Sequence, residues 1–138
     1  MPVNYKIIQA KDFIKAKPTG GIDLEESKKV LGLLAEMAKL VEDCEILLDV
    51  REAYGDLDMA DLNELVLEFG RHREAFRSKI AVLARDDEQF NKAVFVEMFA
   101  GIDGFKVMAF TEFEDAINWL QSDDGIGDLW IGLGTAVQ

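Results

Sequence analysis

The chain has 138 residues, of which 49% are hydrophobic, and it carries a formal net charge of -12 at pH 7. A chain of this length supports one globular domain with a substantial core. The acidic charge argues against nucleic acid or an anionic membrane as the binding partner, because both would repel the protein.

The sequence lacks the marks of a membrane, secreted or disulfide-bonded protein. No apolar run approaches the roughly 18 residues of a membrane-spanning helix, and the first residues lack the zones of a signal peptide, so we expect a cytoplasmic protein. Cys44 is the only cysteine and His72 the only histidine. We expect Cys44 to serve as a small apolar residue and His72 to lie at the solvated end of a helix.

The chain begins with two strand patterns, at residues 5–9 and 13–17. In the second, the apolar side chains of Ile14 and Ala16 alternate with charged ones, which is typical of a strand with one face in water. Pro18 and the two glycines that follow Thr19 end this strand. We therefore expect an antiparallel hairpin at one edge of a sheet.

Helix and strand patterns then alternate as far as residue 121. Apolar residues recur at helical spacing from Asp23 for about five turns. Residues 45–50 are apolar without alternation, as in a central strand covered on both faces. A helix is predicted to begin at Asp58, and further helices at residues 86–100 and 111–121 alternate with strands at residues 79–84 and 105–110.

Each predicted helix begins with a side-chain acceptor followed three residues later by a group that can reach back to it. The pairs are Asp23 with Glu26, Asp58 with Asp61, Asp86 with Gln89 and Thr111 with Glu114. The last pair matches the capping box best, and the Asp58 pair matches it least.

The order of elements is therefore β-β-α-β-α-β-α-β-α, which predicts a single α/β domain over residues 1–121, with a mixed sheet and covering helices. Residues 122–138 are predicted to form a partly apolar C-terminal tail. In such sheets, binding sites lie beyond the carboxyl ends of the strands. This rule points to the loops at residues 51–57, 85–87 and 110–111.

Four stretches carry a likeness to a known family: the strand ILLDV, the helix start DLDMADL, and the segments KIAVLARDDEQFNKAVFVEMF and GFKVMAFTEFEDAINWL. Together they resemble the SpoIIAA-like, STAS-type family of bacterial anti-sigma factor antagonists, over roughly residues 5 to 121. The resemblance implies the SpoIIAA-like fold and a non-enzymatic regulatory role in binding another protein, without a cofactor.

The helix predicted to begin at Asp58 lacks the hydroxyl residues of the family at two positions. In the family, the helix after the third strand begins with an Asp-Ser-Ser/Thr-Gly-Leu type sequence whose hydroxyl is phosphorylated by a partner kinase. Here Asp58 and Leu62 match, but Met59 and Ala60 carry no hydroxyl. A phosphate adds about -1.5 to -2 charges, so the resemblance implies a docking face without this switch. The expected partner-binding residues are Tyr54, Asp56, Asp58, Met59 and Asp61.

Carboxylates near the strand ends leave a second interpretation open, in which a small-ligand-binding or metal-binding protein, or an enzyme, uses Asp49, Glu52, Asp56, Asp58 and Asp61. Oxygen ligands of this kind suit magnesium. The spacing of an EF-hand is absent, however, and no recognisable nucleophile arrangement surrounds His72. We therefore expect no metal, no cofactor and no catalytic residue.

Two further features suggest contacts with other chains. The basic cluster of Arg71, Arg73, Arg77 and Lys79 is either a feature of a helix C-terminus or a surface for an acidic partner. The helix predicted at residues 86–100 is apolar around most of its circumference, so it must bury more than one face, against the tail or a second copy. We predict a homodimer whose interface contains Phe90, Val94, Phe95, Met98 and Phe99.

Overall fold

The computed structural model describes residues 4–9, 13–41 and 45–122, so that Cys44 and nearly all of the predicted tail lie outside the described residues. The strands are β1 (Asn4–Gln9), β2 (Phe13–Gly21), β3 (Glu45–Asp49), β4 (Ala53–Tyr54), β5 (Ile80–Leu83) and β6 (Val107–Phe110). The helices are α1 (Leu24–Leu40), α2 (Met59–Arg71), α3 (Glu88–Ile102) and α4 (Phe113–Gln121).

The strands form one mixed sheet with the order β1-β2-β3-β5-β6, and β4 pairs with the end of β2. β1 runs antiparallel to β2, whereas the other neighbouring pairs are parallel. The α/β class, the initial hairpin and the order of the main elements are thus as predicted. The two-residue strand β4 is an addition, because two residues are too few to show a periodic pattern.

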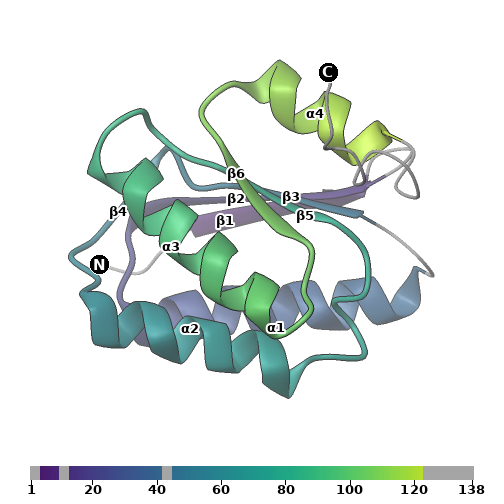
Figure 1. The fold of residues 1–138 in the computed structure, drawn as a ribbon, viewed down its shortest axis with the longest axis horizontal. Coiled ribbons are helices and arrows are strands. Elements are labelled where there is room, and N and C mark those ends of the chain that lie inside the picture. The colour runs from purple at the N-terminus through teal and green to yellow at the C-terminus, as the bar shows by residue number, and fades with distance from the viewer. Residues whose placement is uncertain (1–3, 10–12, 42–44, 123–138) are drawn as a thin grey trace.

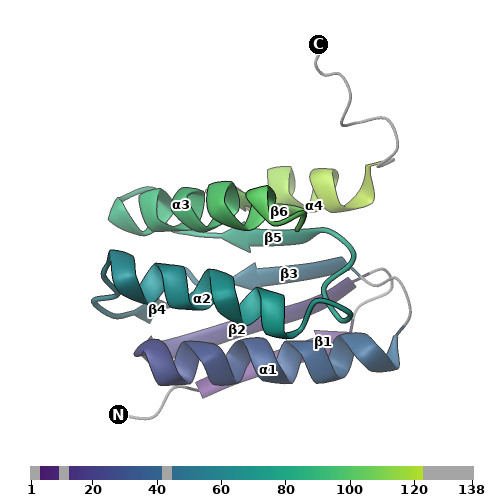
Figure 2. The ribbon, with the colours of Figure 1, turned by 60° about the horizontal axis from the view of Figure 1, so that its bottom comes forward.

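Helices cover both faces of the sheet, with α1, α2 and α3 on one face and α4 on the other (Figures 1 and 2). The central strands supply both cores by alternation. In β3, Ile46 packs into the large cluster under α1 to α3, while its neighbour Leu47 packs under α4 with Leu120. The absence of alternation in the sequence of this strand therefore reflects burial on both faces.

The helix starts agree only in part with the prediction. Asp23 and Asp58 each cap their helix in a complete capping box. The predicted cap at Asp86 is wrong by one residue, because Asp87 accepts the N–H of Gln89. The predicted capping box at Thr111 is also wrong: the N-cap of α4 is Glu112, which makes no side-chain cap hydrogen bond. These helix starts mark where the preceding loops end.

His72 is the C-cap of α2, and its Nε2 lies 3.1 Å from Oε2 of Glu68, so it sits at the end of that helix as expected. In the described part of the chain, no helix combines the length and apolar character needed to cross a membrane.

Candidate functional site

The loop from β3 to α2 lies at the carboxyl end of the central strand, where binding sites occur in parallel sheets. The five predicted partner-binding residues all belong to this loop, to β4 or to the first turn of α2, and we call them the loop surface: Tyr54, Asp56, Asp58, Met59 and Asp61. Tyr54 and Met59 expose 62% and 58% of their surface, and Asp56 and Asp58 are also exposed. Asp61 is half-buried. Two large apolar side chains thus stand in water among carboxylates.

Backbone hydrogen bonds fix the loop to the sheet. The N–H of Ile22 donates to the carbonyl of Tyr54 at 2.8 Å, and that of Gly20 donates to the carbonyl of Glu52 at 3.1 Å. These bonds form the short β4 ladder beside β2. A Cβ at Gly55 would collide with the carbonyl oxygen of Ile22, so only glycine permits this close approach. The loop surface is therefore presented on a rigid support.

Side chains from the β5 to α3 loop and from the first turn of α3 hold the same segment from the other side. Nη1 of Arg85 donates to the carbonyls of Arg51 and Ala53 at 2.7 and 2.9 Å. Nε2 of Gln89 donates to the carbonyl of Val50 at 2.7 Å, and its Oε1 accepts the N–H of Arg85 at the same distance. The sequence pointed to residues 85–87 as a site loop, but the role of Arg85 and Gln89 in binding carbonyls was missed, since these contacts are tertiary.

Asp49, the last residue of β3, is completely buried and accepts three hydrogen bonds from Arg51. The backbone N–H and Nε of Arg51 reach Oδ1 at 3.1 and 3.0 Å, and Nη2 reaches Oδ2 at 3.0 Å. Burial alone would raise the pKa of the Asp49 carboxyl, but the hydrogen bonds and charge of Arg51 outweigh it and lower the pKa below its ordinary value. Asp49 is thus an ionised anchor for the start of the loop.

The carboxylates at the start of α2 are engaged in helix capping. Oδ1 of Asp58 accepts the N–H of Asp61 at 2.8 Å, and Oδ2 of Asp61 accepts the N–H of Asp58 at 3.1 Å. Within the described ranges, no group of three or more His, Cys, Asp or Glu side chains is arranged to hold a metal ion. The carboxylates that suggested a cation site in the sequence therefore do not converge.

A cavity of about 510 Å³ lies behind the loop, between the sheet and helices α1, α2 and α3. The loop forms part of its wall through Val50, Ala53 and Tyr54. Most of the remaining wall is apolar. The polar groups on the side of α3 come from two carboxylates, two cations and an amide: Asp87, Glu88, Arg85, Lys92 and Gln89. No sequence pattern predicted this cavity, because its shape depends on how separate elements pack.

No protein-family model matches the sequence, and no curated protein matches it significantly. Solved structures do share its fold. An uncharacterised protein of the DUF3478 family with a SpoIIAA-like fold, from Shewanella loihica, is 18% identical over 86% of this chain and 93% of its own, with a TM-score of 0.59. An anti-sigma factor antagonist from Mycobacterium paratuberculosis is 11% identical over 87% of this chain and 95% of its own, with a TM-score of 0.57.

The anti-sigma factor antagonist SpoIIAA in its unphosphorylated form is 12% identical over 87% of this chain and 100% of its own, with a TM-score of 0.53. The chain has a SpoIIAA-like fold. This confirms the resemblance seen in the sequence at the level of architecture. Identities of 11% to 18% establish the fold alone, so the function of this SpoIIAA-like domain has to be argued from its own residues.

Proposed function

We propose that this protein is a non-enzymatic, cytoplasmic regulatory module that binds a protein partner through the loop surface. The observation that carries the proposal is the exposure of Tyr54 and Met59 on a loop held at both sides by hydrogen bonds. Exposed aromatic and methionine side chains are typical of protein interfaces, and a rigid loop loses little entropy on binding. The surrounding carboxylates favour a partner with a basic patch around an apolar pocket.

Binding would not depend on phosphorylation at the start of α2. Met59 and Ala60 occupy the positions at which the resemblance places the phosphorylated hydroxyl, and neither side chain can accept a phosphate. Asp58 and Asp61 instead supply permanent negative charge at this helix start, and their positions are set by the capping box. We therefore expect phosphatase treatment of the protein from its native cells to leave partner binding unchanged.

The test is quantitative affinity capture from native cells with the wild type, Met59→Lys and Leu40→Lys. Leu40 is 81% exposed at the far end of α1, so Leu40→Lys makes the same chemical change outside the loop surface. Loss of a central apolar contact weakens an interface by about tenfold or more. A protein retained by the wild type and by Leu40→Lys but lost by Met59→Lys would fit the proposal. Equal retention by all three would contradict it.

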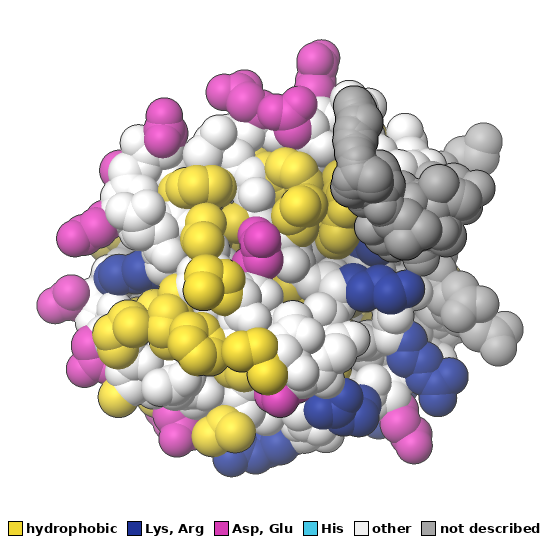
Figure 3. Space-filling model, in the orientation of Figure 1, with side chains coloured by type: hydrophobic (Ala, Val, Ile, Leu, Met, Phe, Trp, Pro, Cys, Tyr) yellow, Lys and Arg dark blue, Asp and Glu magenta, His cyan; other side chains and the backbone are white. Residues whose placement is uncertain are grey.

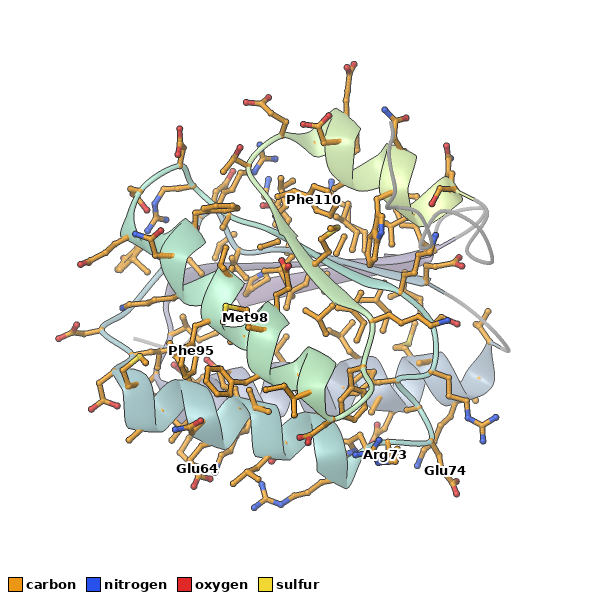
Figure 4. All side chains as sticks on the ribbon, viewed as in Figure 1. Glu64, Arg73, Glu74, Phe95, Met98 and Phe110 are labelled. Carbon is orange, nitrogen blue, oxygen red and sulfur yellow. The ribbon has the colours of Figure 1, made fainter. Side chains whose placement is uncertain are left out.

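We further propose that the protein is a homodimer that uses one side of α3. Of the predicted interface residues, Phe90, Val94 and Phe95 are partly buried, whereas Met98 and Phe99 are exposed. Figure 3 shows hydrophobic side chains gathered over this side of the molecule, and Figure 4 shows Met98 on α3. Other large apolar residues are also exposed, on the same helix, on β6 and on α4: Ile102, Met108 and Phe113.

A further inference from the structure

The cavity behind the loop is partly open to solvent, and its lining is mostly apolar. At about 510 Å³ it falls within the range of small-molecule sites, roughly 300 to 1,000 Å³. Its apolar walls come from all three helices on this face and from the sheet: Val30, Leu31, Leu48, Leu65, Phe69 and Val96. Walls of this kind suit a hydrocarbon chain.

The polar groups of the cavity come mostly from α3 and the loop before it, and most of them already have partners. Nε of Arg85 donates to Oδ2 of Asp87 at 3.2 Å, and Asp87 also caps α3. Gln89 is bonded to backbone carbonyls of the β3 to α2 loop. Lys92, which is half-buried, makes no ion pair or hydrogen bond with any residue that the structure describes. One ammonium group therefore remains for an anionic ligand.

We infer that the cavity binds a long-chain monocarboxylate, with its methylene chain against the apolar walls and its carboxylate against Lys92. A single negative charge matches a single available cation. A polyanion such as a nucleotide would meet the repulsion of a protein whose net charge is -12. Asp87 and Glu88 both line the cavity and are exposed, and these two carboxylates add to the local repulsion of higher charges. This inference does not rest on the proposed protein partner, although Tyr54 belongs both to the cavity wall and to the loop surface.

Titration calorimetry on delipidated full-length protein tests the inference with decanoate, dodecanoate and tetradecanoate, and with ATP as the nucleotide probe. Each buried methylene contributes about 0.8 kcal/mol, so affinity is expected to rise about fourfold per methylene and about 15-fold per step of the series until the cavity is full. Failure of all three carboxylates to bind, an affinity that does not change with chain length, or binding of ATP in their place would overturn the inference.

Variants separate the two ends of the ligand. Lys92→Met should weaken dodecanoate binding about tenfold, the size of a hydrogen bond to a charged group, and leave dodecanol binding unchanged. Lys29→Met, on the exposed side of α1, is the matched control and should bind both like the wild type. An equal loss for the acid and the alcohol, or no loss for the acid, would exclude Lys92 as the carboxylate partner and overturn the assignment.

Filling the cavity tests whether the methylene chain of the ligand lies there. Ala93→Leu adds volume from α3, and it should raise the unfolding temperature of the ligand-free protein while weakening dodecanoate binding. Leu65→Phe adds volume from α2 and serves if Ala93→Leu does not fold. Dodecanoate affinity equal to that of the wild type in a folded filling variant would show that the ligand lies elsewhere.

Discussion

The buried pair of Asp49 and Arg51 provides the sharpest test of how the loop is held. Asp49→Asn keeps the shape of the side chain but removes its charge, so the three N–H groups of Arg51 lose an ionised acceptor. Removing one partner of a fully buried ion pair costs about 3 to 5 kcal/mol. Because 39% of the Arg51 side chain is exposed, water can solvate its guanidinium, and Asn retains one acceptor oxygen. We therefore expect a loss of about 2 kcal/mol at neutral pH.

Urea unfolding measures this loss directly. With an m-value of about 2 kcal/mol per molar, the midpoint of Asp49→Asn should lie about 1 M below that of the wild type. Asp87→Asn is a useful comparison, because Asp87 is an exposed carboxylate that also accepts hydrogen bonds from a backbone N–H and an arginine. Its substitution should cost less, since an exposed charge gains little from its partner.

The pH dependence of stability tests whether the charge of Asp49 stabilises the loop. The pKa of Asp49 lies below its ordinary value in the folded protein, because Arg51 outweighs burial. Its contribution to stability is therefore complete above the unfolded pKa of about 3.9 and is lost as pH falls through the lower folded pKa. The stability gap between the wild type and Asp49→Asn should shrink below about pH 4. A gap that stays constant down to the acid unfolding of both proteins would show that the charge of Asp49 is not what stabilises the loop.

Two further predictions concern the support of the loop and the proposed dimer. Gly55→Ala should cost about 1 to 3 kcal/mol, because its Cβ meets a carbonyl of the neighbouring segment. Gly70→Ala, which lies in open space on α2, should be neutral or stabilising. Thermal unfolding of both variants measures the difference, and equal unfolding temperatures would contradict the prediction. In analytical ultracentrifugation at micromolar concentration, the wild type should sediment as a dimer and Met98→Lys with Ile102→Asp as a monomer. A monomeric wild type would rule out the dimer.

Local patterns in the sequence predicted the main elements because each pattern has a local physical cause. Ile14 and Ala16 alternate with polar residues since only one face of β2 meets the large core, and both are completely buried. The pair Asp58 and Asp61, the weakest match to a capping box, nevertheless forms both hydrogen bonds. A capping box depends on two side chains that lie one turn apart, so its residues are already neighbours in the sequence.

The roles of the basic cluster at the end of α2 and after it could not be predicted from the sequence. Its members look alike in sequence, but tertiary contacts give them different roles. Arg73, labelled in Figure 4, donates to the carbonyl of Asp103 and lies over the ring of Phe105. Lys79 is buried, and its Nζ donates to the carbonyls of Trp119 and Ser122 at the end of α4. Partners 30 to 43 residues away cannot be inferred from charge spacing.

The cavity and the loop surface depend on the same loop but can be tested separately. Tyr54 belongs to both, since it lines the cavity and is exposed on the surface, so a change there cannot distinguish a protein partner from a small ligand. Met59 is exposed and does not line the cavity, whereas Lys92 lines the cavity and lies outside the loop surface. Met59→Lys should therefore leave dodecanoate affinity unchanged, and Lys92→Met should leave partner capture unchanged. If instead each substitution altered both measurements, the loop would transmit ligand binding to the partner surface, as expected of a module whose docking face responds to a ligand.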